Sequence, residues 1–569
     1  MQRKSFVSLF IPALLGAVTF TTTSPSRAHA DTPQELLGEP GSSDWQNACE
    51  DEIDELYPGT WPIFRPNPAL PISKEFAEES GGTDSTPQLE SCDSTNPLEC
   101  LQLVTIDTDT YPNAVCSDGS PGAFYIRPGS GAKANRWLIH LQGGGGCVDY
   151  GECVERWCGT QGVYSAAKMS TNWLPEAAGT PIVPEILDKG IAFGARELDG
   201  TEPNAFEDWT HVYVYYCSSD GWMGRDSTVA MTNAAGTKTL DVAARGHTIL
   251  SIVRKMLRRN GPTGTSWHPV GLTKSTCDPV DRGISADQCV PDLDDATHIL
   301  FSGTSAGALG AIQNADWFLS MFPNARTALA LDAAITPTRD ALSAHSVHIA
   351  DPTNPGTYAL YADVRDDVFR ASWQPGGYFD LVNAFVDETC ALTQANTVID
   401  ISNLCSHISG LLHGEDTSGA PFIETPTFLR LSLTDSVSWN ASRNILVTPD
   451  PSGVGFVPID IDTFAHVMRD SLLDLYDNTT PVTGLFAPRC GKHVGFSIHE
   501  PFFLDTTEDV TESAAGVFTA QGVTSTTHDA LGEWLLELGV WYDDPANNPA
   551  PSTRYADHPL AAGATSNCP

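Results

Sequence analysis

The chain has 569 residues, of which 41% are hydrophobic, and a formal net charge of −40 at pH 7. This excess of acidic side chains repels the phosphate backbone of nucleic acids, so DNA and RNA are excluded as partners. The same charge repels anionic polymers and anionic membranes at low salt and favours solubility.

The N-terminus has the parts of a secretory signal peptide. Arg3 and Lys4 precede an apolar stretch over 6–20, and Ala28-His-Ala30 is a small-residue cleavage site. The apolar stretch is shorter than the ~20 residues that cross a bilayer, and no later segment is long and apolar enough to span one. We expect cleavage near Ala30, which removes three basic residues and no acid and so changes −40 to −43. The mature protein is then secreted, extracellular or periplasmic, without a stable membrane span.

The chain beyond the signal peptide divides into three parts by composition. Residues 31–100 are rich in Glu, Asp, Pro, Ser and Gly without a hydrophobic period, which predicts a poorly structured acidic extension. Residues 101–545 form the main domain, and 546–569 are a C-terminal tail. The extension contains three cysteines that could form disulfides with the main domain: Cys49, Cys92 and Cys100.

Fourteen cysteines in an exported chain allow up to seven disulfides. Their connectivity stays open, although three pairs are close enough in the chain to be local: Cys147 with Cys153, Cys277 with Cys289, and Cys390 with Cys405. There is no Cys-x-x-Cys pair, and Cys490-x-x-His493 is only half of a metal site. We therefore expect no structural zinc.

The main domain alternates short apolar runs with longer runs of helical period, the pattern of a parallel sheet covered by helices. Strands are predicted at Arg136–Gln142, His211–Cys217, Ala296–Ser302 and Pro426–Leu433. A helix is predicted at Leu240–Arg259, which has apolar residues at helical spacing and a basic last turn. The predicted fold class is α/β, with a mostly parallel central sheet flanked by helices.

The motif Gly303-Thr-Ser-Ala-Gly307 directly follows a predicted strand and precedes a helix-like run. A strand, a sharp turn and a helix make a nucleophile elbow, in which small residues flank a serine held in a strained conformation. The helix N-terminus places N–H groups near developing negative charge. We predict Ser305 as a nucleophile; the alternative is a simple glycine-rich turn.

A second glycine-rich turn, Gly143–Gly146, follows the first of these strands and lies upstream of the elbow. Glycines let backbone N–H groups approach a ligand closely, and a loop in this position supplies the other half of an oxyanion hole. Phosphate binding is a poorer interpretation, because no Gly-Lys-Ser/Thr sequence follows.

A serine nucleophile needs a histidine base, and the histidine needs an acid that fixes its tautomer. The acid precedes the histidine in this kind of fold. Asp435 follows a strand-like run, and Asp332 is its main competitor. His493 lies in a loop that Cys490 could clamp, but composition alone does not choose the base. Nine histidines follow the elbow: His345, His348, His407, His413, His466, His493, His499, His528 and His558.

The chain resembles the pectin acetylesterase and Notum family of carboxylesterases in five segments, which follow the family's order between about residues 101 and 510. They are Trp137-Leu-Ile-His-Leu-Gln-Gly-Gly-Gly-Gly-Cys147, Tyr216-Cys-Ser-Ser-Asp-Gly-Trp222, Phe301-Ser-Gly-Thr-Ser-Ala-Gly307, Thr425-Pro-Thr-Phe-Leu with Asp435, and Cys490-x-x-His493. Five ordered matches are far more specific than one. The resemblance implies an α/β-hydrolase-like fold.

The resemblance also implies a role for each matched residue. Ser305 would be the nucleophile, His493 the general base and then acid, and Asp435 the carboxylate that orients it. Trp222 would lie near the substrate pocket. The oxyanion hole would consist of three backbone N–H groups, those of Gly145, Gly146 and Ala306.

The implied activity is a serine esterase that removes O-acetyl groups from a polysaccharide such as pectin. We expect a monomer that needs neither a metal nor an organic cofactor. Gly146 stands where the family usually has an aromatic residue, and the stretch Ser218–Trp222 is closer to the Notum branch, whose members remove longer acyl chains from proteins. A Notum-like or lipase-like esterase for longer acyl chains is therefore one alternative. Another is an inactive secreted binding protein with the hydrolase fold.

Overall fold

The computed structural model describes most of residues 31–56, 102–172, 206–258, 289–364, 377–395 and 405–496, and short stretches at 273–274, 506–512, 518–526, 530–535 and 554–556. The predicted signal peptide, most of the C-terminal tail, Cys92, Cys100 and Cys277 lie outside these residues. Within them, no helix is long and apolar enough to cross a bilayer.

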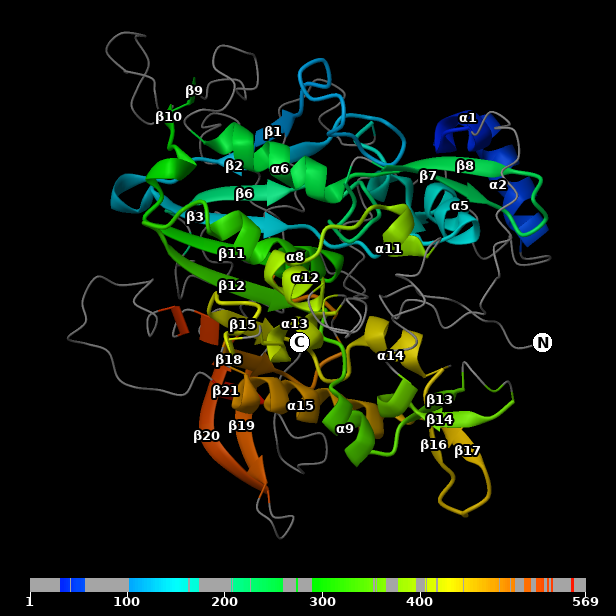
Figure 1. Ribbon diagram of the computed structural model, residues 1–569, viewed down its shortest axis with the longest axis vertical. Coiled ribbons are helices and arrows are strands. Elements are labelled where there is room, and N and C mark those ends of the chain that lie inside the picture. The colour runs from blue at the N-terminus through cyan, green and yellow to red at the C-terminus, as the bar shows by residue number, and fades with distance from the viewer. Residues whose placement is uncertain are drawn as a thin grey trace.

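A nine-stranded sheet forms the centre of the molecule (Figure 1). Its order is β1 (Gln102–Thr105), β2 (Ala123–Arg127), β6 (Thr210–Val214), β3 (Arg136–Leu141), β11 (His298–Thr304), β12 (Arg326–Asp332), β15 (Thr427–Arg430), β18 (Val482–Ala487) and β21 (Arg554–Ala556). Neighbours from β6 to β21 are parallel, whereas β1 and β2 form an antiparallel edge. The predicted α/β class with a mostly parallel sheet is confirmed, and each predicted strand overlaps one of these strands.

Alternate residues of the central strands enter two different cores, as the period of a strand requires. Ile299 and Phe301 of β11 pack with helix α8 (Ala306–Leu319), which lies beside α6 (Gly246–Leu257) on one face. Leu300 of the same strand lies in the core of the opposite face, where it joins Trp534. Burial on both faces explains why these strands read as continuous apolar runs.

The remaining helices lie around the sheet and its ends (Figure 1). They are α1 (Pro33–Leu37), α2 (Ser43–Leu56), α5 (Tyr150–Cys158), α9 (Arg339–Ala344), α11 (Tyr378–Leu381), α12 (Glu388–Ala395), α13 (Ile408–His413), α14 (Ser436–Ser442) and α15 (Ile461–Asn478). A small sheet contains β14 (Tyr358–Leu360), β13 (His348–Ala350), β16 (Val447–Pro449) and β17 (Phe456–Pro458). The arrowheads of β6 and β12 point to the side where α5 and α14 lie, so the carboxyl ends of the parallel strands face this side.

The described part of the predicted extension is helical rather than poorly structured. Trp45, Cys49 and Ile53 recur every four residues along α2, and all three are buried. Cys49 forms a disulfide with Cys158 of α5, and Trp45 Nε1 donates to the carbonyl of Trp157 at 3.2 Å. The apolar stripe of α2 therefore docks on α5.

The predicted helix over Leu240–Arg259 begins later than expected. Residues Thr239–Ala244 form β8, which pairs with β7 (Ser227–Thr232), and α6 starts at Gly246. Leu240, Val242 and Ala244 are buried at every second position, which is the period of a strand, but three residues are too short a run to distinguish it in the sequence from the helix that follows. The Asp220 carboxylate accepts the Gly246 N–H at 2.7 Å and so stabilises the start of the helix there.

Candidate active site

Ser305 occupies the turn between β11 and α8, in a backbone conformation that few side chains adopt. Its φ of 55° and ψ of −122° lie outside the helix and strand regions. A Cβ on Gly303 would lie 2.1 Å from the carbonyl oxygen of Gly307, and one on Gly307 would lie 2.0 Å from that of Leu141. Gly303 is thus required for the turn to close onto the start of α8, and Gly307 for α8 to pack against β3.

Ser305, His493 and Asp435 are joined by hydrogen bonds. Ser305 Oγ lies 2.9 Å from His493 Nε2, and His493 Nδ1 lies 2.6 Å from Asp435 Oδ2. Asp435 is fully buried, and only 8% of His493 is exposed. The structure brings together the three residues that the sequence singled out, and Asp435 rather than Asp332 contacts the histidine.

Asp435 is also the N-cap of α14. Its Oδ1 accepts the N–H groups of Val437 and Ser438 at 2.8 and 3.0 Å, which leaves Oδ2 for the imidazole. The hydrogen bonds of the cap hold the carboxylate in the orientation in which Oδ2 contacts His493.

The competing carboxylate, Asp332, holds the chain that follows His493. Its Oδ1 lies 3.1 Å from Arg430 Nη1, and its Oδ2 accepts the N–H groups of Gly495 and Phe496 at 2.6 and 2.8 Å. Arg430 Nη1 also donates to the His493 carbonyl at 3.1 Å. This ion pair was not predicted from the sequence. A charged Arg430 inside the apolar run Phe428–Leu433 was the available signal.

The chain before His493 is held against α14 and the end of β15. Thr434 Oγ1 donates to the Cys490 carbonyl at 2.8 Å, and the Ser436 N–H donates to Gly491 at 3.0 Å. Cys490 is itself disulfide-bonded. The loop that carries His493 is therefore fastened on both sides of the histidine.

Residues Gln142–Gly146, the glycine loop, pass directly beside the elbow. A Cβ on Gly143 would lie 2.3 Å from the Thr304 carbonyl oxygen and 3.0 Å from Ser305 Cβ. Gly144 and Gly145 have φ values of 143° and 63°, which glycine adopts without strain. Ala306, the third predicted oxyanion residue, is buried at the start of α8.

His140 lies close to the elbow but is no candidate base. It is fully buried between Ser302 Oγ, 2.8 Å from Nδ1, and Thr304 Oγ1, 3.1 Å from Nε2. Burial lowers its pKa to about 3, so the imidazole is neutral and links β3 to β11. In the described part of the chain, no group of three or more His, Cys, Asp or Glu side chains is arranged to hold a metal ion.

Trp222, which we expected near the substrate pocket, lies inside the protein against the glycine loop and α8. Its side chain is fully buried, and its Nε1 donates to the Gln142 carbonyl at 3.0 Å. It packs so closely on α8 that a Cβ on Gly310 would lie 2.3 Å from Trp222 Cβ. At this interior position the apolar ring is removed from water and its one N–H donor has a partner.

Comparisons of the sequence with known proteins point to one family. The pectinacetylesterase family profile matches residues 95–261. Relatives named palmitoleoyl-protein carboxylesterases also match, among them the inactive notum1b of Danio rerio, which is 30% identical over 20% of this chain and 67% of its own length. The chain belongs to the pectinacetylesterase family. Pectin acetylesterase 11 of Arabidopsis thaliana is 27% identical over 39% of this chain and 42% of its own, so the match spans less than half of that relative.

Among solved structures, the Wnt deacylase Notum from Drosophila superposes on this pectinacetylesterase-family chain with a TM-score of 0.45. The superposition covers 77% of this chain and 93% of that one, at 17% sequence identity.

Proposed function

We propose that the chain is a secreted serine carboxylic-ester hydrolase that removes O-acetyl groups from a polysaccharide such as pectin. The hydrogen-bond chain from Ser305 through His493 to Asp435, at 2.9 and 2.6 Å, carries this proposal. Membership of the pectinacetylesterase family supports the acetyl substrate. The N-terminal segment with the features of a signal peptide and the disulfides support secretion.

The proposed reaction has two steps. His493 Nε2 takes the proton of Ser305 Oγ as this oxygen attacks the ester carbonyl carbon. The bond to the alcohol breaks, the alcohol leaves with the proton from His493, and an acyl-enzyme remains. Water then attacks the acyl-enzyme with His493 as base, which releases the carboxylic acid and Ser305. Asp435 keeps the histidine proton on Nδ1, so that Nε2 is free to act as base.

We assign the oxyanion hole to the N–H groups of Gly145, Gly146 and Ala306. The passage of the glycine loop beside Ser305 and the position of Ala306 at a helix N-terminus support this assignment. One donor of such a hole is worth about 10²- to 10³-fold in kcat.

A second candidate is an esterase for longer acyl chains. Gly146 has no side chain to limit the length of the acyl group, and several relatives are named palmitoleoyl-protein carboxylesterases. The net charge of −40 also disfavours the anionic backbone of de-esterified pectin.

The proposal is tested with p-nitrophenyl esters of two, four, eight and sixteen carbons, and with acetate release from acetylated pectin. We expect the wild type to prefer the acetyl ester and Ser305→Ala to lose at least about 10³-fold in kcat. Ser320→Ala, at the exposed C-terminal end of the same helix, is the matched control and retains activity. A preference for eight or more carbons favours the second candidate. Equal inactivity of wild type and Ser305→Ala on every ester supports the binding protein instead.

A further inference from the structure

Four successive carbonyls of the glycine loop each accept a hydrogen bond from a buried side chain. The pairs are Trp222 Nε1 to Gln142 at 3.0 Å, Lys168 Nζ to Gly143 at 3.4 Å, Arg156 Nη2 to Gly144, and Tyr216 Oη to Gly145 at 2.7 Å. None of the four donor side chains is more than 2% exposed. Water therefore does not compete for these carbonyls.

These bonds fix the direction of the peptide planes. In a trans peptide, the C=O of one residue and the N–H of the next point in opposite directions, and the described residues contain no cis peptide. Arg156 thus directs the Gly145 N–H away from itself, and Tyr216 does the same for Gly146. Neither N–H has a hydrogen-bond partner within the described part of the chain, so both are available to a ligand.

The Tyr216 hydroxyl can point its proton in only one useful direction. Its oxygen accepts the Gly221 N–H at 2.7 Å, which leaves the proton for the Gly145 carbonyl. Burial and the charge of Asp220 raise the pKa of Tyr216 above its ordinary value, so the hydroxyl stays protonated. The carboxylate of Asp220 holds the Gly221 turn through four donors: Ser218 Oγ and the N–H groups of Trp222, Gly224 and Gly246.

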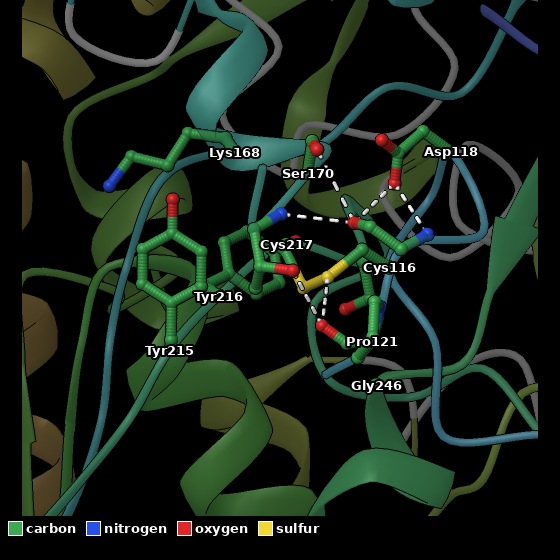
Figure 2. Close-up of a disulfide and its surroundings, with 12 residues drawn as sticks. Cys116, Asp118, Pro121, Lys168, Ser170, Tyr215, Tyr216, Cys217 and Gly246 are labelled. Carbon is green, nitrogen blue, oxygen red and sulfur yellow. Dashed lines mark hydrogen bonds between the residues drawn. A yellow bond between two sulfur atoms is a disulfide. The ribbon is translucent and has the colours of Figure 1, made fainter. Parts of the chain in front are cut away.

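Covalent bonds fix the segments that carry these donors. Two disulfides tie α5, the helix of Arg156, to other segments: Cys153 in the middle of the helix bonds to Cys147, and Cys158 at its C-terminal end bonds to Cys49. Figure 2 shows Lys168 and Tyr216 near a third disulfide, whose Cys217 directly follows the tyrosine.

Two of the donors to the glycine loop are cationic side chains, Arg156 and Lys168. A cation hydrogen-bonded to a peptide oxygen polarises that peptide and strengthens its N–H as a donor.

We propose that Arg156 and Tyr216 are positioning residues for ester hydrolysis, which direct the N–H groups of Gly145 and Gly146 toward the oxygen that becomes negative in the transition state. This inference rests on the proposed function of Ser305. It gives the segment Tyr216–Trp222 a role in orienting the glycine loop rather than in contacting substrate. Because the oxyanion forms only in the transition state, the effect falls on kcat and leaves KM nearly unchanged.

The direct test compares Tyr216→Phe with Tyr215→Phe. Both hydroxyls are buried and donate to backbone carbonyls, but the Tyr215 hydroxyl bonds to Ala167, outside the glycine loop. With p-nitrophenyl acetate, we expect Tyr216→Phe to lower kcat about 10- to 100-fold, somewhat less than loss of an oxyanion donor. KM should stay within about 2-fold, and Tyr215→Phe should keep near wild-type kcat.

A second readout separates positioning from a structural role. Phenylboronic acid forms a tetrahedral adduct with a catalytic serine, so its Ki should rise as kcat/KM falls across the variants. Arg156→Met should behave like Tyr216→Phe, whereas Arg156→Lys, which keeps a cationic donor, should recover part of the loss. The thermal unfolding transition of each variant shows whether it is folded. If Tyr216→Phe does not fold, the comparison of Arg156→Met with Arg156→Lys tests the positioning role instead.

Two outcomes overturn the inference, and they are distinguishable. Wild-type kcat in both Tyr216→Phe and Arg156→Met, with Ser305→Ala inactive, refutes the positioning role and leaves the proposed function standing. A wild-type chain that hydrolyses no ester refutes the proposed function and this inference together.

Discussion

At the scale of single residues, Asp332 and Asp435 show how neighbours divide the roles of two buried carboxylates. Asp332 is the last residue of β12, and Asp435 follows the adjacent strand β15 at the start of α14. Asp332 has one oxygen on Arg430 and the other on two backbone N–H groups, so neither oxygen is directed at the imidazole. Asp435 uses one oxygen for its helix cap and presents the other to His493. The division follows from which donors each oxygen already has.

The Asp332–Arg430 pair is expected to affect both stability and catalysis. Asp332→Asn leaves a fully buried guanidinium without its counter-ion, which should cost about 3–5 kcal/mol in the free energy of unfolding. It also weakens the hold on the chain after His493, so kcat should fall. Urea unfolding and p-nitrophenyl acetate kinetics on the same preparations measure the two effects.

A double variant separates the two effects of this pair. Asp332→Leu with Arg430→Met removes both charges and should recover much of the lost stability. It does not restore the bond from Arg430 to the His493 carbonyl, so kcat should stay at least about 10-fold low. If kcat recovered together with stability, the pair would have no part in positioning His493.

The sequence predicts some of these residues better than others, for a physical reason. Ser305 and its flanking glycines form a local turn, whose steric demands are written in five consecutive residues. His493 lies 188 residues away in the chain and on a loop, so only the family resemblance could select it among nine histidines. The burial of Trp222 could not be predicted from its motif, because the groups that enclose it, the Gln142 carbonyl and Gly310 of α8, lie 80 or more residues away in the chain.

At the scale of elements, the segment from β7 to α6 shows where periodicity fails. Leu240, Val242 and Ala244 are buried in β8 because β7 pairs with it, and this partner is not visible in the segment itself. The helix α8, by contrast, follows a strand and a motif that defines its first residue. The start of α8 could therefore be predicted from its own residues, whereas the strand β8 could not.

The N-terminal end of α12 should make stability depend on pH. Burial raises the pKa of Asp387 to about 7, although its bond from the Cys390 N–H opposes the shift. Because the folded-state pKa exceeds the unfolded value near 4, Asp387 favours folding at low pH and loses this contribution as the pH rises from about 4 to 7. The shift corresponds to a few kcal/mol at most. Asp387→Asn keeps an acceptor for the cap without the charge, so it should be more stable than the wild type at pH 8.

A matched helix cap serves as the control for Asp387. Asp460 caps α15 through the Thr463 N–H at 2.8 Å. Its pKa is lowered because, although partial burial opposes the shift, the hydrogen bonds from Thr463 and neighbouring N–H groups prevail. In urea unfolding at pH 5 and pH 8, Asp460→Asn should give no gain at the higher pH. An equal gain from both substitutions would mean that net charge, rather than burial of Asp387, is responsible.

At the scale of the whole molecule, the acidic charge and the docked N-terminal helices could be predicted to different degrees. The net charge of −40 is a property of composition and needs no fold. The docking of α2 on α5 includes the Cys49–Cys158 disulfide, which joins residues 109 positions apart and follows from neither spacing nor composition. The apolar residues of α2 recur at helical period, but they are few among many acidic residues, so the period is weak in the sequence.

The charge of the molecule should make its activity on an anionic polymer depend on salt, if a polysaccharide is the substrate. A chain of net charge −40 repels acetylated galacturonan whose carboxyl groups carry no methyl ester, over distances comparable to the Debye length. That length falls from about 30 Å at 0.01 M salt to about 8 Å at 0.15 M. The KM for acetate release from this polymer should therefore drop several-fold over that range, while the KM for neutral p-nitrophenyl acetate stays constant. A KM for the polymer that does not change, or that rises with salt, would mean that cationic groups near Ser305 outweigh the net charge in attracting the substrate.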